Sequence, residues 1–369
     1  MHRPQGPAAE HDGAIASTSL TPFRSRPKAL YVKYSLAPAA RMKLFCQPFA
    51  VHKRVPLTIS RGTTAQSTNL WLRLSAEGIE GWGEAAPFSI GTHQQTLEML
   101  QADVARLQQA LEPFHPFDRQ AIEAAVIELS IHSASRAALD VALWDWCGKA
   151  TGQPIWRLLG LDLNRIQPTS VTVGISSPEA ARQRSQDWLQ QTSARALKVK
   201  LGSPKGIEAD RAMFQAIYDH VPTNVNLSVD ANGGWTLAEA MAMAEWLSDR
   251  RVTHLEQPLP VSQNTDLANL KQHSPIPIFV DESCFKSSDI PHLANLVDGI
   301  NIKLMKAGGL SEVLRMLHTA QACGLKVMFG CYSDSSLANG AMAQLSPLAD
   351  YLDLDSHLNL RDDPFTGLA

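Results

Sequence analysis

Ala196-Leu-Lys-Val-Lys200 is a short apolar run that ends on a lysine, and four similar runs follow it along the chain. Each run precedes a turn signal and a helix-like stretch, so we interpret the runs as parallel strands joined by helices. The later runs, which end on an acid or a lysine, are Leu227-Ser-Val-Asp230, Thr253-His-Leu-Glu256, Ile278-Phe-Val-Asp281 and Gly299-Ile-Asn-Ile-Lys303. Because parallel barrel strands bring their carboxyl ends to one face, the pattern predicts acids and lysines gathered at one mouth.

Three further strand-like stretches extend this pattern at 168–174, 326–330 and 350–355. Eight strands with amphipathic or Ala/Leu-rich stretches between them predict an α/β fold, a (β/α)8 TIM-type barrel over residues 151–369. Few residues remain after the eighth strand-like stretch to complete the barrel, because the sequence given ends soon afterwards at Ala369.

Residues 42–150 predict a separate α+β capping domain. Strand-like stretches at 44–51, 69–74 and 81–84 indicate a small antiparallel sheet, with a polar loop at 56–64 that carries Arg61. Helical periods follow at 92–111, 117–129 and 133–151. The last is expected to begin at a Ser133 cap and to end at Gly152. In this domain we interpret Trp82 and Phe88 as lid contacts or as core residues.

Residues 1–41 mix Pro, Ala, Ser and scattered Arg without a sustained apolar period. We interpret them as a disordered extension or as the product of an upstream start codon, with Met42 opening the domain. The scarcity of acids after Asp12 leaves an organelle transit peptide as the alternative.

The composition narrows the functional class. The net charge of −3 argues against a nucleic-acid partner or an anionic membrane surface, and no apolar run is long enough to span a bilayer. Five cysteines without CxxC spacing indicate reduced thiols and a cytoplasmic protein. The sequence leaves open a homo-oligomer.

Asp230, Glu256 and Asp281 each end an apolar strand and precede a turn. Three carboxylates converging at a barrel mouth repel one another, so a hard divalent cation is their natural partner. Oxygen-only ligands favour Mg²⁺, with Mn²⁺ as a substitute. Taken singly, each acid could instead be a helix cap or a solvated turn residue.

Lys198 and Lys200 stand on either side of Val199, and alternate side chains of a strand point to the same face. We therefore expect both lysine side chains to point into the barrel. Neighbouring positive charges are expected to lower their pKa values from about 10.4 towards neutrality, which makes an amine a usable base. Lys303 ends a strand across the mouth, and Lys306 is interpreted as solvated or loop-supporting. Two bases on opposite sides of a metal-held carboxylate predict removal of the α-proton and its return from the other face, with the metal stabilising an enediolate. The alternative for each lysine is an ion pair with the carboxylates.

Together these motifs resemble the enolase superfamily, muconate-lactonizing subgroup. The resemblance runs from about Met42 to Leu360, and it rests on motifs that span five strands: Lys198-Val-Lys200, Asp230-Ala-Asn232, Glu256-Gln-Pro258, Asp281-Glu-Ser283 and Asn301-Ile-Lys303-Leu-Met-Lys-Ala-Gly-Gly309. Asp353-Leu-Asp355 resembles the Asp-x-Asp signature of dipeptide epimerases of the L-Ala-D/L-Glu type.

This resemblance implies a Mg²⁺-dependent epimerase acting on L-Ala-L-Xaa dipeptides, with L-Ala-L-Glu as the first substrate to try. It implies that Asp353 and Asp355 hold the substrate's ammonium group, as an anionic pocket would. It also assigns Arg61 to the side chain of the second residue, and Asn232 and Asn301 to substrate binding. A carboxylate is the partner that an arginine fork prefers.

Two departures leave alternatives open. Asp334 stands where the family often has Glu, and members usually continue into a final segment that returns to the capping domain, which this chain apparently lacks. An o-succinylbenzoate synthase or a muconate-type cycloisomerase would use the same site with one working base. A non-catalytic metal-binding paralogue is the third reading.

Overall fold

The computed structural model describes residues 42–91 and 93–366. The expectation for the extension 1–41 lies outside the described residues.

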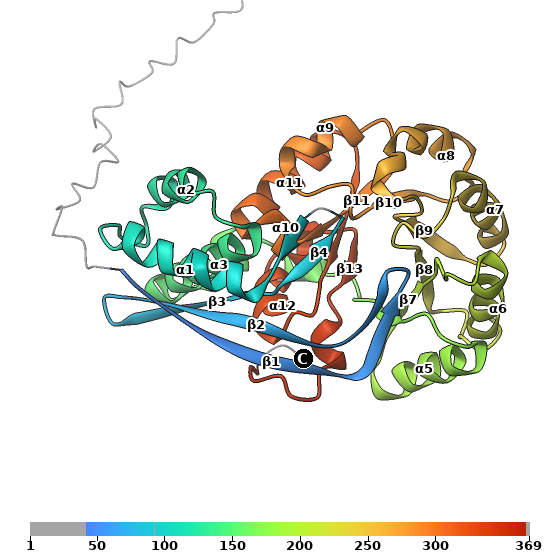
Figure 1. The fold of residues 1–369 in the computed structure, drawn as a ribbon, viewed down its shortest axis with the longest axis horizontal. Helices are drawn as coiled ribbons and strands as arrows, with labels where there is room; N and C mark the ends of the chain where they lie inside the picture. Colours follow the sequence, from blue (N-terminus) through green and yellow to red (C-terminus); the bar gives the residue numbers. More distant parts are fainter. Residues whose placement is uncertain (1–41, 92, 367–369) are drawn as a thin grey trace, which may run out of the picture. The chain divides into compact units, whose positions relative to one another are not determined.

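The capping domain contains a three-stranded antiparallel sheet in the order β1 (Lys43–Ile59), β2 (Gly62–Ala76), β3 (Ile79–Ala85). The prediction of a polar loop over 56–64 is too long, because β1 and β2 stay paired up to a tight turn at Ser60 and Arg61. The pairing shifts register between His52 and Leu57. The resulting long hairpin reaches towards the first barrel strands (Figure 1).

Three helices and a short hairpin complete the capping domain. They are β4 (Phe88–Ile90), β5 (His93–Gln95), α1 (Leu97–Leu111), α2 (Arg119–Glu128) and α3 (Ser133–Thr151). The expected helix end at Gly152 is confirmed by its φ of 65°. The cap residue of α3 is His132, not the expected Ser133, and the Asp103 carboxylate accepts both its backbone N–H and a hydrogen bond from its ring.

Gly81 and Gly83 explain how closely β3 packs on α3. A Cβ atom at Gly81 would collide with the Ala142 carbonyl, and one at Gly83 would collide with the Ala138 carbonyl. Only glycine permits this approach of strand to helix. The approach fixes the position of Glu84 at the end of the same strand.

The eight predicted barrel strands are confirmed as one parallel sheet. In chain order they are β6 (Val171–Val173), β7 (Ala196–Lys200), β8 (Asn226–Asp230), β9 (Val252–Glu256), β10 (Ile278–Val280), β11 (Gly299–Lys303), β12 (Lys326–Gly330) and β13 (Tyr351–Asp353). The first and last strands meet where the Ser170 N–H donates to the Leu352 carbonyl at 2.8 Å, which closes the barrel.

Helices follow the strands around the outside of the barrel (Figure 1). Their bounds are α4 (Ile155–Leu158), α5 (Pro178–Gln191), α6 (Ile207–Tyr218), α7 (Leu237–Ser248), α8 (Leu267–His273), α9 (Ile290–Leu293), α10 (Leu304–Ala307), α11 (Leu310–Ala322) and α12 (Ser336–Ala343). None of the helices in the described ranges is long and apolar enough to cross a bilayer.

The described chain after Leu360 runs back along the capping domain, a contact that the sequence did not predict. The Arg361 N–H donates to the His52 carbonyl, and Asp362 accepts from the His52 backbone at 2.7 Å. Phe365 packs edge-on against Phe49 and Trp71 at ring distances of 5.3 and 5.6 Å. These contacts join the end of the barrel domain to β1 and β2.

Candidate active site

Parallel pairing places the predicted acids and lysines at one level of the barrel. Lys200 pairs with Asp230 and Asp230 pairs with Glu256 across β7, β8 and β9. On the other side of the barrel Lys303 is level with Asp353, through Gly330. The site therefore forms at the carboxyl ends of the strands, as the sequence predicted.

Lys198 lies at the centre of this cluster. Its ammonium is 2.6 Å from Glu256, 2.7 Å from Asp353 and 3.3 Å from Asp230. Val199 is fully buried on the other face of the strand, which turns Lys198 and Lys200 inward. Burial alone would lower the pKa of Lys198, but the carboxylates of Asp353, Glu256 and Asp230 outweigh it and raise that pKa well above its usual value.

Lys200 and Lys303 face each other across the barrel. β7 and β11 are four strands apart in a closed sheet of eight, so their side chains approach from opposite sides. Lys200 is 2.5 Å from Asp230, and Lys303 is 2.8 Å from Asp281. Both lysines line a small cavity of about 50 Å³, together with Asp353 and Asp355.

The lowering of the pKa that was expected for Lys198 is wrong. Burial lowers the pKa of Lys303, but the charge of Asp281 outweighs it and holds the pKa above its usual value, as for Lys198. The nearest charges to each ammonium are carboxylates, whereas the expectation counted neighbouring cations. In this structure each of Lys198, Lys200 and Lys303 lies within ion-pair distance of a carboxylate.

The three acids have the chemistry of a magnesium site. Asp230, Glu256 and Asp281 are at most 1% exposed, and burial together with the Asp230 charge raises the pKa of Glu256 to about 7. Within residues 42–91 and 93–366 no three acid, histidine or cysteine side chains are close enough to hold a metal as they stand. Lysine ammonium groups lie against all three carboxylates and neutralise them instead.

Two asparagines support the metal fit. Asn232 donates its backbone N–H to Asp230 at 2.8 Å, and the side-chain amide of Asn301 donates to Glu256 at 2.7 Å. The amide oxygens Asn232 Oδ1 and Asn301 Oδ1 are buried and accept no hydrogen bond from any described residue. Buried unpaired acceptors beside three carboxylates fit a cation. The structure thus places both asparagines on the acids, rather than free in the cavity.

Asp353 ends the eighth strand, Asp355 lies two residues beyond it, and both line the same cavity as the facing lysines. Asp353 is bound by Lys198 and accepts from the Ser170 hydroxyl at 2.8 Å. Asp355 accepts the Thr172 N–H at 2.6 Å, and burial, helped by the Asp353 charge, raises its pKa to about 6.

Arg61 is exposed at the barrel mouth, but its guanidinium is already bound to the barrel. Its guanidinium is 2.7 Å from Glu282 and donates to the Asn232 carbonyl at 2.9 Å. The hairpin tip of the capping domain is thereby attached to the barrel beside the predicted metal acids. Phe88, left open as lid or core, is buried and stacks on Tyr332 at 4.9 Å.

Of the two interpretations of Lys306, the solvated one is wrong, because the side chain is 2% exposed, and the loop-supporting one agrees with its hydrogen bonds to main-chain carbonyls. Its ammonium donates to Asp281 Oδ1 at 2.6 Å, to the Cys284 carbonyl at 2.9 Å and to the Asp281 carbonyl. The signal that could have revealed it is its position in the single helical turn directly after β11, which returns the side chain over the strand end. Sequence reasoning also missed Lys53, a lysine of β1 that lines the cavity.

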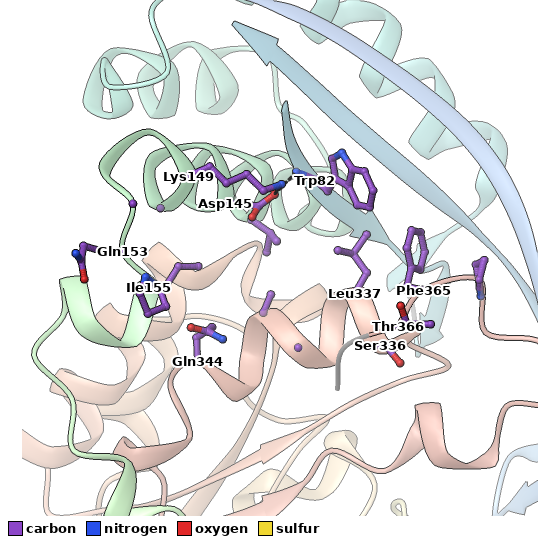
Figure 2. Close-up of a pocket in the computed structure, with 17 residues that line it drawn as sticks. Trp82, Asp145, Lys149, Gln153, Ile155, Ser336, Leu337, Gln344, Phe365 and Thr366 are labelled. Carbon is purple, nitrogen blue, oxygen red and sulfur yellow. Dashed lines mark hydrogen bonds and ion pairs between the residues drawn. The ribbon is translucent and has the colours of Figure 1, made fainter. Parts of the chain in front are cut away.

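A larger cavity of about 750 Å³ lies between α3 and α12 (Figure 2). Trp82, Leu337 and Phe365 line it, and Asp145 pairs with Lys149 on its wall. None of the predicted site residues lines this cavity, so we place the site at the barrel mouth in spite of the smaller volume there.

Comparisons with known proteins agree with this architecture. The mandelate racemase / muconate lactonizing enzyme N-terminal domain matches residues 41–160, and the enolase C-terminal domain-like family matches residues 180–366. A hydrophobic dipeptide epimerase from Roseobacter litoralis is 45% identical over 334 residues, covering 88% of this chain and 93% of that protein. An L-Ala-D/L-Glu epimerase from Bacteroides thetaiotaomicron is 33% identical over 359 residues, covering 96% and 90%.

One solved structure similar to this chain is a dipeptide epimerase from Enterococcus faecalis V583, complexed with Mg and the dipeptide L-Leu-L-Tyr. It superposes with a TM-score of 0.84 at 29% identity, and the match covers 89% of this chain and 94% of that one. With family matches over both domains, this chain belongs to the enolase superfamily, in its mandelate racemase and muconate lactonizing branch.

Proposed function

We propose that this protein is a Mg²⁺-dependent dipeptide epimerase that inverts the α-carbon of the second residue with two bases. The observation that carries the proposal is the placement of Lys200 and Lys303 on opposite sides of one cavity, each beside a carboxylate. The names of the relatives support the dipeptide as substrate.

Asp230, Glu256 and Asp281 would hold the cation. When bound, the cation neutralises the substrate carboxylate and makes its α-proton more acidic. Asn232 and Asn301 keep Asp230 and Glu256 oriented through the hydrogen bonds described above. Orientation of metal ligands by such neighbours is a common requirement for tight binding.

Each of the two facing amines handles one proton: one takes the α-proton from the substrate, and the other gives its own proton to the opposite face. One amine has to be neutral to accept the α-proton, and the other has to be an ammonium to return a proton from the opposite face. Lys200 Nζ and Lys303 Nζ can exchange these roles with the direction of the reaction. Lys198 stays an ammonium, since three carboxylates surround it.

Asp353 and Asp355 would receive the amino terminus of the dipeptide. Lys198 already neutralises Asp353, so Asp355 is the carboxylate without a cationic partner within 4 Å among the described residues. A substrate ammonium supplies that partner, which is the reason to expect a free amino terminus.

Dipeptides with a hydrophobic second residue are the first substrates to test. Arg61 is engaged by Glu282, which removes the cation that would read an acidic side chain, and the 45% identical relative is a hydrophobic dipeptide epimerase. L-Ala-L-Glu is the second candidate, because Arg61 is 39% exposed at the mouth and could exchange Glu282 for a substrate carboxylate.

The test is deuterium exchange in D₂O, with mass spectrometry of a dipeptide panel incubated with the Mg²⁺-loaded protein. We expect one deuteron at the α-carbon of the second residue, together with the inverted product. EDTA-treated protein is the control and should show neither. Absence of exchange with every dipeptide would reject the proposal.

A further inference from the structure

Lys53 is a lysine of the capping domain buried against the barrel. It lies on β1 and is 8% exposed, whereas its neighbour Arg54 points outward and is exposed. Its backbone forms an antiparallel bridge with Leu360, so the strand holds it beside the end of the barrel domain. The strand therefore presents a positive charge inward at this point.

The ammonium of Lys53 has a single hydrogen-bond acceptor in the described structure. It donates to the Ser333 hydroxyl at 2.9 Å, and it forms no ion pair within 4 Å with any described carboxylate. An ammonium has three donors, so two of them have no acceptor among residues 42–91 and 93–366. Burying a cation this way is costly unless something else pairs with it.

The charges that surround Lys53 belong to the barrel mouth. Asp355 and Asp334 attract it from a distance, and the Cys331 thiol beside them is neutral because burial raises its pKa to about 12. Burial lowers the pKa of Lys53 more than these groups raise it. The side chain therefore lacks a close counter-ion.

Lys53 is also a wall of the reaction cavity. The cavity between Lys200 and Lys303 is lined by Lys53, Leu57 and Asp355 as well. The cavity has a volume of about 50 Å³, which is smaller than a dipeptide. A substrate that enters it therefore has to contact these side chains. On the function proposed above, Asp355 receives the substrate's amino terminus, which places Lys53 beside the first residue of the dipeptide.

We propose that Lys53 is a specificity-determining residue that selects the first residue of the dipeptide by charge. It excludes basic side chains by like-charge repulsion and accepts neutral or acidic ones. Specificity often rests on such a repulsive element. This inference rests on the proposed epimerase function.

The test compares three dipeptides that differ in the charge of the first residue: L-Met-L-Leu, L-Lys-L-Leu and L-Glu-L-Leu. With the Mg²⁺-loaded wild-type protein we expect kcat/KM for L-Lys-L-Leu to be about 100-fold below that for L-Met-L-Leu, a like-charge penalty. Lys53→Met should reduce this ratio to less than about 10-fold, and Lys53→Glu should bring L-Lys-L-Leu above L-Glu-L-Leu.

Arg54→Met is the matched control, because it removes a positive charge one residue away on the exposed face of the strand. It should leave the ratio at its wild-type value, and thermal unfolding checks that each variant is folded. An unchanged ratio in Lys53→Met, or an equal loss for all three dipeptides, would overturn the role of Lys53 and leave the epimerase intact. A wild-type protein that exchanges no dipeptide would overturn both proposals.

Discussion

Lys306 holds one oxygen of Asp281 while Lys303 faces the other. Lys306 Nζ is 2.6 Å from Oδ1, and Lys303 Nζ is 2.8 Å from Oδ2. Lys306 also donates to the main chain of Asp281 and of Cys284, so it ties the end of β10 to the turn after β11. Both oxygens of Asp281 are therefore ion-paired, and only Oδ2 is paired with a lysine that lines the reaction cavity.

Lys306→Met should weaken magnesium binding by about 10- to 100-fold, the usual cost of removing a group that orients a metal ligand. Titration calorimetry with Mg²⁺ measures this without any substrate. Lys326→Met, at the exposed start of β12, is the control and should bind Mg²⁺ as the wild type does. A folded Lys306→Met protein with wild-type Mg²⁺ affinity would contradict this role.

Removal of either facing lysine should separate the two halves of the reaction. With Lys200→Met or Lys303→Met, epimerisation should fall by about 10²- to 10⁴-fold, the usual contribution of a general acid or base. The lysine that is left can still exchange the α-proton of one stereoisomer. We therefore expect each variant to incorporate deuterium from D₂O into only one of the L,L and L,D dipeptides, and the two variants to prefer opposite isomers. Exchange of the same isomer by both would place the lysines on one side of the substrate.

Asp355→Asn should lower kcat/KM for dipeptides by about 10- to 100-fold, mainly through KM, because it removes a charged acceptor for the amino terminus. The N-acetyl form of the same dipeptide is the matched control. It has no ammonium, so its weak turnover should not change. A similar loss for both substrates would mean that Asp355 acts on the fold instead, through its hydrogen bond from Thr172.

The barrel could be predicted because its signals are local. Each strand is a short apolar run next to a turn, and parallel pairing then sets Lys200, Asp230 and Glu256 at one level without further information. The same reasoning gave the inward direction of Lys198 and Lys200, because alternation along a strand depends only on the neighbouring residue.

Contacts between distant parts of the chain could not be predicted. Lys53 and Ser333 are 280 residues apart, and no local pattern relates a cap lysine to a barrel loop. The shift in the pKa of Lys198 was predicted in the wrong direction for a similar reason, since the sign of the shift depends on which charge is nearest in space. For Lys306, the sequence predicted the helical turn after β11, but it did not predict that the side chain points into the barrel.

Glu84 gives a prediction for the joint between the two domains. It is fully buried at the end of β3 and accepts the backbone N–H groups of Ser335 and Ala338 at 3.0 and 3.1 Å, which start α12 of the barrel. Burial, with the Asp334 charge adding to it, raises the pKa of Glu84 from 4.5 to about 7. Since the folded state holds this proton more tightly than the unfolded state, the contribution of Glu84 to stability falls as the pH rises from 4.5 to 7.

Glu84→Gln removes this titration and leaves the other groups in place. We expect the variant to be less stable than the wild type by about 1–3 kcal/mol at pH 5, where an unsatisfied donor in the α12 cap is the main cost. The difference should become smaller at pH 8, because there the wild type bears a buried charge that the variant lacks. Urea unfolding at both pH values measures it, and the comparison within each pH cancels every other titrating group. A difference that grows with pH would show that the ionised form of Glu84 is the one that holds α12.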